Sequence, residues 1–159
     1  MILYHGSNIR IDCPDLSKSK PYKDFGKGFY LSDKYEQAFL LAEQRTKIMQ
    51  CGEPCVSKFS FDEKFMHSDE LDVLVFEDYS EEWVNFVIKN RDLTTPQPYH
   101  HFDIVYGPIA DDGVTFLLRR YKAGGISFKE LMDGLKYPLG ITFQYYFGST
   151  KALSKLHKI

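Results

Sequence analysis

Residues 24–33 read Asp-Phe-Gly-Lys-Gly-Phe-Tyr-Leu-Ser-Asp and form the most informative local pattern in a chain of 159 residues. Two glycines within three positions let the backbone turn sharply before an extended segment. Side chains alternate across a strand, so a strand here sends Phe29 and Leu31 to one face and Tyr30 to the other. The stretch therefore predicts a strand over 28–32 that presents Tyr30 for stacking on a flat ring. The alternative is an ordinary cross-strand tyrosine.

The segment after this strand has the pattern of a helix. Asp33 is followed three residues later by Glu36, which is the spacing of a capping box. Apolar residues then recur at helical intervals, at Tyr35, Ala38, Phe39 and Ala42. We therefore expect a helix over 33–49.

The remaining chain alternates irregularly between strand and helix patterns. Further strands are expected at 2–5, 56–61, 71–76, 102–106 and 141–147. A further helix is expected behind a Ser80 cap, with Trp83, Phe86 and Val87 as its apolar face. Others are expected at 115–122, at 127–136 behind a Ser127–Glu130 capping box, and at 151–157 behind Thr150. Strict strand–helix alternation is absent, so the pattern favours a single α+β domain over 1–159 with a largely antiparallel sheet.

Composition excludes several classes of protein. The chain has 20 basic and 22 acidic residues, and this balance disfavours a general nucleic-acid binder. Hydrophobic residues make up 43%, which disfavours disorder, and no apolar run reaches the length of a membrane span. Three cysteines with no leader pattern before them predict a reducing cytoplasm. Cys51 and Cys55 are four apart, but no second pair at zinc spacing accompanies them.

A second small motif, His5-Gly6-Ser7, begins at the last residue of the first expected strand. Gly6 has no Cβ, so a ligand can approach the backbone closely beside the imidazole of His5. The alternative is a histidine that closes a strand before a Gly-Ser turn.

Taken in order, the segments 5–7 and 26–31 resemble the H-G-[ST] and G-x-G-[IF]-Y-[FL] motifs of ADP-ribosyltransferases of the diphtheria-toxin and poly(ADP-ribose) polymerase type. Nearly the whole chain is similar to a small bacterial family assigned to the same superfamily. That family shares the D-F-G-K-G-F-Y-L pattern, D-I-V-x-G-P-[IV]-A-D-D at 103–112, and a C-terminal Q-x-x-F followed by K-A-L. The resemblance implies the ADP-ribosyltransferase fold, in which a split antiparallel sheet is flanked by helices.

The resemblance also implies how NAD, the co-substrate, is held. His5 would bind a ribose hydroxyl, the backbone of Gly6 would fix the nicotinamide carboxamide, and Tyr30 would stack on the nicotinamide ring. Ser7 and Phe29 complete the expected cofactor-binding set. A cationic pyridinium against a tyrosine face is worth roughly 0.5–2 kcal/mol.

At the third motif, where these enzymes usually carry a glutamate, this chain departs from the family pattern. In the expected strand over 141–147, alternation puts Thr142, Gln144 and Tyr146 on one face. Gln144 would then be the third catalytic residue beside His5 and Tyr30. A glutamine still hydrogen-bonds a ribose 2′-hydroxyl but supplies no negative charge. This favours single ADP-ribose transfer, NAD hydrolysis or binding alone; the other reading is a polar residue on an edge strand.

The expected function is therefore a mono-ADP-ribosyltransferase that modifies an unidentified acceptor, either protein or nucleic acid. By family analogy it would be a bacterial toxin or effector, with a neighbouring antitoxin or regulator as its partner. The alternatives are a catalytically inactive module that binds NAD or ADP-ribose, and a protein-interaction module. Asp111 and Asp112 are the nearest paired carboxylates that can supply the missing charge, cap a helix or bind a cation. Four lysines in 18–27 can meet the NAD pyrophosphate.

Overall fold

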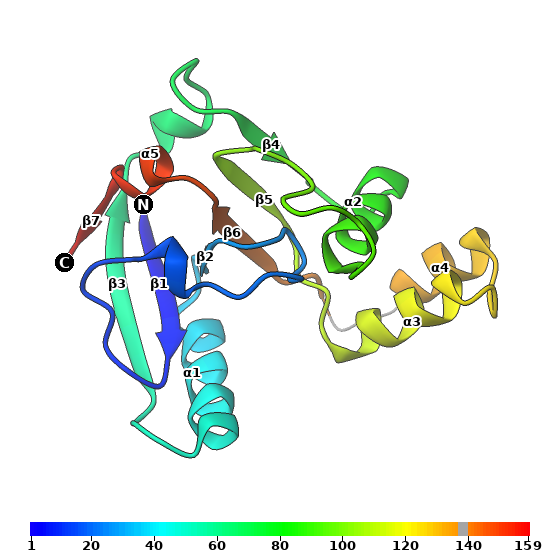
Figure 1. The fold of residues 1–159 in the computed structure, drawn as a ribbon, viewed down its shortest axis with the longest axis horizontal. Coiled ribbons are helices and arrows are strands. Elements are labelled where there is room, and N and C mark those ends of the chain that lie inside the picture. Colours follow the sequence, from blue (N-terminus) through cyan, green and yellow to red (C-terminus); the bar gives the residue numbers. More distant parts are fainter. Residues whose placement is uncertain (137–139) are drawn as a thin grey trace.

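The computed structural model describes residues 1–136 and 140–159 and shows an α+β protein built on two β-sheets (Figure 1). The strands are β1 (Ile2–Ser7), β2 (Phe29–Leu31), β3 (Cys55–Phe61), β4 (Val73–Val75), β5 (Ile104–Pro108), β6 (Phe143–Phe147) and β7 (Leu156–Lys158). The helices are α1 (Tyr35–Met49), α2 (Glu81–Arg91), α3 (Asp112–Lys122), α4 (Phe128–Leu135) and α5 (Thr150–Leu153). Within this described part, none of the helices is long and apolar enough to span a bilayer.

Among the described residues, the strands form two sheets whose backbones are joined at one isolated bridge. The first sheet has the order β1-β3-β7 and is antiparallel throughout. The second has the order β2-β6-β5-β4, and only β4 runs parallel to its neighbour. An isolated bridge joins them, in which Tyr4 and Ser32 exchange hydrogen bonds of 2.7 and 2.9 Å. The expected largely antiparallel α+β arrangement is therefore confirmed.

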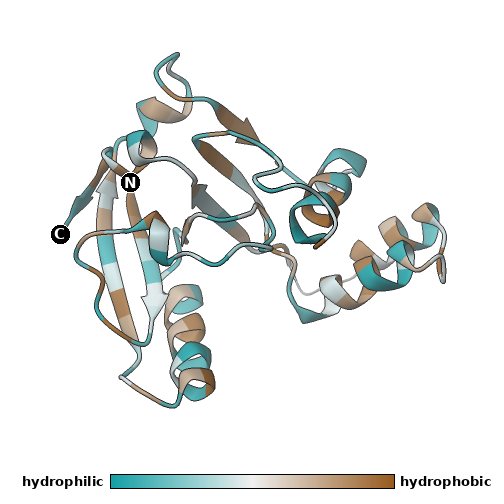
Figure 2. Cartoon of the chain, in the orientation of Figure 1, coloured by the Kyte–Doolittle hydropathy of each residue, from teal (hydrophilic) through white to brown (hydrophobic). Residues whose placement is uncertain are grey.

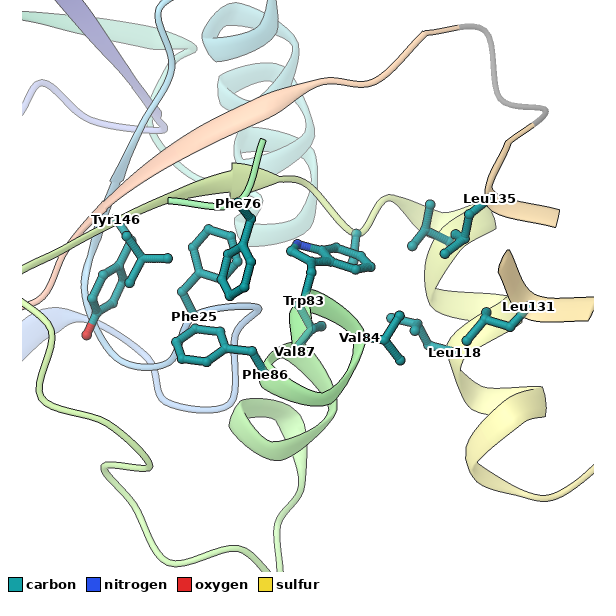
Figure 3. Packing of buried hydrophobic residues seen from close by; sticks show 13 residues of the cluster. Phe25, Phe76, Trp83, Val84, Phe86, Val87, Leu118, Leu131, Leu135 and Tyr146 are labelled. Carbon is teal, nitrogen blue, oxygen red and sulfur yellow. The ribbon is translucent and has the colours of Figure 1, made fainter. Parts of the chain in front are cut away.

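Two apolar clusters lie on opposite faces of the second sheet, because side chains alternate along its strands. Tyr145 and Phe147 pack with Leu3 and other residues of the first sheet. Tyr146 faces the other way, into a cluster that reaches the helices through Trp83 (Figure 3). Strands β4 and β5 carry the most apolar segments, as their colour in Figure 2 shows. The sequence alternation predicted for 141–147 is thus confirmed over Phe143–Phe147, where the strand forms.

The helix caps follow largely from local chemistry. Ser80 Oγ accepts a hydrogen bond of 3.1 Å from the Trp83 amide at the start of α2. Ser127 and Glu130 form the predicted reciprocal capping box on α4. Asp111 caps α3 by accepting from the Val114 amide at 2.9 Å, so this helix begins three residues earlier than the apolar pattern suggested.

The predicted capping box at the start of α1 is wrong. The helix begins at Tyr35 behind Lys34, whose side chain makes no capping hydrogen bond. The bridge to Tyr4 holds Ser32 in an extended conformation, and the Ser32 hydroxyl accepts from the Lys34 amide at 3.0 Å. Because of this strand pairing, the helix begins later in the chain than the local sequence pattern predicted.

The predicted C-terminal helix over 151–157 is also wrong beyond its first turn. Ser149, and not Thr150, is the N-cap, and α5 ends at Leu153. The chain then forms β7, which pairs with β3 through Phe61 and Leu156. The open edge of β3 offers backbone hydrogen bonds that a local sequence pattern does not reveal.

Candidate active site

A cavity of about 500 Å³ lies where β1, β2, α1 and the start of β6 meet, and we call it the junction pocket. Gly6, Tyr30 and Gln144 all line it, although they come from three separate motifs. Gln37 and Leu41 of α1 also line this pocket. The structure thus brings together one residue from each predicted motif.

The backbone of Gly6 is open towards this pocket. Tyr4 directs its amide and carbonyl away from β3, because both bond to Ser32. Hydrogen-bonding direction alternates along an antiparallel strand, so the N–H and C=O of Gly6 also point away from β3. Among residues 1–136 and 140–159, no group hydrogen-bonds to either of them. Gly6 therefore offers one donor and one acceptor side by side.

The reason for glycine at position 6 is helix packing as well as ligand access. A Cβ at Gly6 would lie 1.9 Å from the carbonyl oxygen of Ala38 in α1. That oxygen belongs to the backbone and cannot move without the helix. The close approach of α1 to β1 thus requires glycine here, whereas the sequence analysis attributed it to an approaching ligand or to a Gly-Ser turn.

His5 lies behind the junction pocket and not in its wall. Its Nδ1 is 2.7 Å from the carbonyl oxygen of Tyr30, and its ring stacks on Phe29 with centroids 4.2 Å apart. A carbonyl only accepts, so Nδ1 carries the proton and Nε2 keeps its lone pair. Burial lowers the pKa of His5 to about 4. His5 is therefore a neutral acceptor at pH 7.

Tyr30 is less exposed than predicted. Its hydroxyl donates to the Gly26 carbonyl at 2.7 Å and accepts from the Phe25 amide at 3.1 Å. Burial raises the pKa of this hydroxyl well above its usual range, so it stays protonated. The ring packs edge-on against Tyr146, and the Lys23 ammonium lies 4.9 Å from its centroid. Tyr30 is thus both pocket wall and core, because the glycine turn draws its hydroxyl inward.

Two of the predicted cofactor residues do not reach the junction pocket. Phe29 is buried between the sheets, where it packs edge-on against Phe59. Ser7 is buried as well, and its hydroxyl is 3.5 Å from the side-chain oxygen of Asn8. Both side chains lie on the strand faces that point away from the pocket.

Gln144 is held by a carboxylate that the sequence did not single out. Its Nε2 donates to Asp24 Oδ2 at 2.9 Å, and both side chains are buried. Asp111, which the sequence offered as a source of negative charge, caps α3 at the rim of the pocket. The sequence feature that could have pointed to Asp24 is its position as the first residue of the D-F-G-K-G pattern.

Gln37 is a second residue that the sequence analysis missed. Its Nε2 donates to the Phe143 carbonyl at 3.0 Å, which ties α1 to β6 and fixes the orientation of the amide. Its Oε1 is buried and has no partner among the described residues. Buried acceptors are nearly always satisfied, so an unpartnered oxygen on a residue that lines the pocket favours a ligand that supplies a donor.

Basic side chains gather beside His5. The charges of Lys23 and Arg45 both lower the pKa of His5, after burial as the main cause. Burial also lowers the pKa of Lys23, and the charges of Arg45 and Lys20 add to the effect. No ion pair involves Lys23 among residues 1–136 and 140–159. This cluster is a place where an anion would be stabilised.

Fold and site together define an α+β protein with a ligand-sized pocket at the junction of two sheets. The chain belongs to the family described as "Protein of unknown function (DUF3990)", whose model matches residues 1–158. Comparisons with curated proteins and with solved structures gave no match. In the described ranges, no three His, Cys, Asp or Glu side chains are grouped as metal ligands.

Proposed function

We propose that this protein has the ADP-ribosyltransferase fold, binds NAD in the junction pocket, and transfers one ADP-ribose to an acceptor, either protein or nucleic acid. One observation carries the proposal. Gly6, Tyr30 and Gln144, to which the resemblance assigns three different contacts with NAD, line the same cavity of about 500 Å³. Cavities of this size are typical of small-molecule sites.

The polar groups of the pocket match a carboxamide. A nicotinamide carboxamide has one acceptor oxygen and two N–H donors. The open N–H and C=O of Gly6 would pair with the oxygen and one N–H. The unpartnered Gln37 Oε1 is buried in the ligand-free protein, so the Gln37 side chain would shift towards the pocket to accept the second N–H. Leu41 and Tyr30 would flank the ring as apolar walls.

NAD is longer than this pocket, so its remaining parts would extend past Tyr30. Gln144 would accept a hydrogen bond from a hydroxyl of the nicotinamide ribose. The neutral Nε2 of His5 would accept from a ribose hydroxyl, and the cluster of Lys20, Lys23 and Arg45 would meet the diphosphate. Lys23 would leave the face of Tyr30 when the nicotinamide stacks there.

In the proposed reaction, the bond between the ribose C1′ and the nicotinamide nitrogen breaks, and its electron pair leaves with neutral nicotinamide. The ribose then passes through an oxocarbenium-like state, as in glycoside hydrolysis. The acceptor attacks C1′ and loses a proton. Gln144 stabilises the positive charge by its amide dipole and not by a full charge, which fits a single transfer better than chain elongation.

A catalytically inactive module that binds NAD or ADP-ribose is the second candidate, because Gln144 is neutral. By family analogy, we also propose a toxin or effector role that a neighbouring antitoxin or regulator controls. Growth of cells that express the wild-type chain, compared with cells that express the Gln144→Ala variant, tests that role.

The deciding experiment incubates the purified protein and a cell extract with NAD, and measures released nicotinamide by chromatography and ADP-ribose adducts by mass spectrometry. We expect both products, and their loss in Gln144→Ala. Gln97→Ala, a glutamine outside the junction pocket, is the matched control and keeps activity. Retained NAD binding without nicotinamide release would support the inactive module. Absence of both binding and release would overturn the NAD-based functions.

A further inference from the structure

The buried carboxylate of Asp24 determines which end of the Gln144 amide faces the junction pocket. A carboxylate only accepts hydrogen bonds, so the group 2.9 Å from Asp24 Oδ2 must be the NH₂ of Gln144. The Gln144 oxygen is therefore the end of the amide that points away from Asp24. No described residue donates to that oxygen, and Gln144 lines the pocket whereas Asp24 does not. The Gln144 side chain therefore presents a hydrogen-bond acceptor, and not a donor, to the junction pocket.

Asp24 is itself held rigidly by groups from two other elements. Arg91 of α2 donates to Oδ1 from Nε at 2.9 Å and from Nη2 at 2.5 Å. The backbone amide of Ala110, in the segment between β5 and α3, donates to Oδ2 at 2.9 Å. Arg91 also donates to the Thr115 hydroxyl at 2.8 Å. The carboxylate is thus oriented before any ligand arrives.

This arrangement explains why glutamine, and not the glutamate usual in the resembling enzymes, occupies position 144. A glutamate there would place a second carboxylate within hydrogen-bond distance of Asp24. Two carboxylates at such a distance do not both stay ionised, so one of them would hold a proton. Glutamine satisfies Asp24 and still presents an oxygen to the pocket.

We infer that Asp24 and Gln144 act as one unit, in which Asp24 is a positioning residue that orients and polarises the Gln144 amide so that its oxygen accepts a hydrogen bond from the substrate ribose. The inference rests on the proposed function. Hydrogen bonds in a chain polarise one another in a buried setting, so the carboxylate strengthens the acceptor at the far end of the amide. The negative charge missing from the third motif is then supplied indirectly.

The test compares wild type with Asp24→Asn, Gln144→Glu and the double variant, using the kcat and KM of nicotinamide release. In Asp24→Asn the Gln144 amide loses its fixed orientation, so we expect kcat to fall about tenfold or more while KM changes little. Gln144→Glu alone should also lose activity and regain it as pH rises, because the two carboxylates share a proton. In the double variant the asparagine oxygen can stay on Arg91 while its NH₂ donates to the new carboxylate, at the cost of the hydrogen bond from the Ala110 amide, so activity should return in part.

Asp92→Asn is the matched control, because Asp92 also pairs with a basic side chain, Lys122 at 3.1 Å, but does not line the junction pocket. It should change thermal stability only. An active wild type whose kcat is unchanged in Asp24→Asn would overturn the inference, as would a double variant no better than the product of the two single effects. Either result leaves the proposed transferase intact.

A second measurement does not depend on turnover. In ¹⁵N-labelled protein, the side-chain NH₂ signal of Gln144 is identified by its loss in Gln144→Glu. We expect slow hydrogen exchange of this group in wild type and fast exchange in Asp24→Asn. Equal exchange in the two proteins would overturn the positioning role. A protected signal in a protein that neither binds nor cleaves NAD would instead refute the proposed function and, with it, the ribose contact.

Discussion

At the scale of single residues, the neutral imidazole of His5 has a consequence for stability. Burial lowers its pKa from 6.5 to about 4 in the folded protein. Between these values the unfolded chain binds a proton that the folded chain does not, so stability falls as pH decreases through this window. Above about pH 7 His5 contributes no pH dependence. The full loss is on the order of 3 kcal/mol.

Urea denaturation between pH 4 and 7.5 measures this effect by comparing wild type with His5→Gln, which cannot titrate. We expect the wild type to lose more stability than the variant as pH falls. His157→Gln, at an exposed position in β7, is the control and should follow the wild type. Parallel curves for wild type and His5→Gln would contradict the lowered pKa.

Lys23 allows a second prediction at this scale. Burial and the neighbouring basic side chains lower its pKa, so its charge is held at a cost to the fold. Lys23→Met should therefore leave the melting temperature unchanged or raise it. If the cluster meets the NAD diphosphate, the same variant should raise KM for NAD several-fold at low salt and less at high salt.

Titration of NAD at two ionic strengths, followed by nicotinamide release or by the thermal shift, measures this prediction. Lys129→Met serves as the control, because Lys129 lies in the first turn of α4, away from the junction pocket. A salt dependence that is identical in wild type and Lys23→Met would contradict a role of this cation in binding.

At the scale of elements, the contact between α1 and β1 is the tightest constraint on the pocket. A methyl group at position 6 would lie 1.9 Å from the Ala38 carbonyl oxygen, so α1 must move away from β1. Gly6→Ala should cost about 1–3 kcal/mol, as overpacking in a core does. It should also weaken NAD binding, since α1 carries Gln37 and Leu41 of the pocket wall.

The control is Gly113→Ala in the first turn of α3. There the added methyl would meet Asp111 at 3.5 Å, an ordinary contact, and the helix gains from alanine. Its melting temperature should be equal to or above that of wild type. Thermal unfolding of the two variants measures this difference. Equal melting temperatures for Gly6→Ala and Gly113→Ala would show that α1 moves away from β1 without a loss of stability.

At the scale of the whole molecule, the two apolar clusters share the second sheet as a common wall. Phe147 and Tyr146 are neighbours on β6 but pack into different clusters. Loosening one cluster should therefore unfold both together. This would make residues 1–159 one cooperative unit, as the sequence analysis predicts.

Leu3→Ala tests that cooperativity, because Leu3 is fully buried in the cluster between the sheets and Trp83 in the other cluster. The variant should lose about 2–5 kcal/mol. Its guanidinium unfolding should give the same midpoint by Trp83 fluorescence and by far-UV circular dichroism. A fluorescence midpoint that stays at the wild-type value would indicate two independent units.

The sequence by itself determined the features that depend on neighbouring residues. The alternation at 141–147 predicted which face of β6 carries Gln144, and Ser80 and Ser127 predicted the starts of α2 and α4. These features are local, because a strand face or a helix cap depends on residues within one or two turns of the chain.

Only the tertiary structure decided the features that depend on residues far apart. Asp24 and Gln144 are 120 positions apart, and no spacing rule connects them. Likewise, the pairing of Leu156 with β3 overrode a helical pattern, and the packing of α1 buried Gly6 beneath Ala38. The physical reason is the same in each case. Backbone groups at an open sheet edge and buried charges need hydrogen-bond partners, and a helix backbone excludes side chains that would overlap it. These requirements of the whole fold outweigh the local preference of the residues for helix or strand.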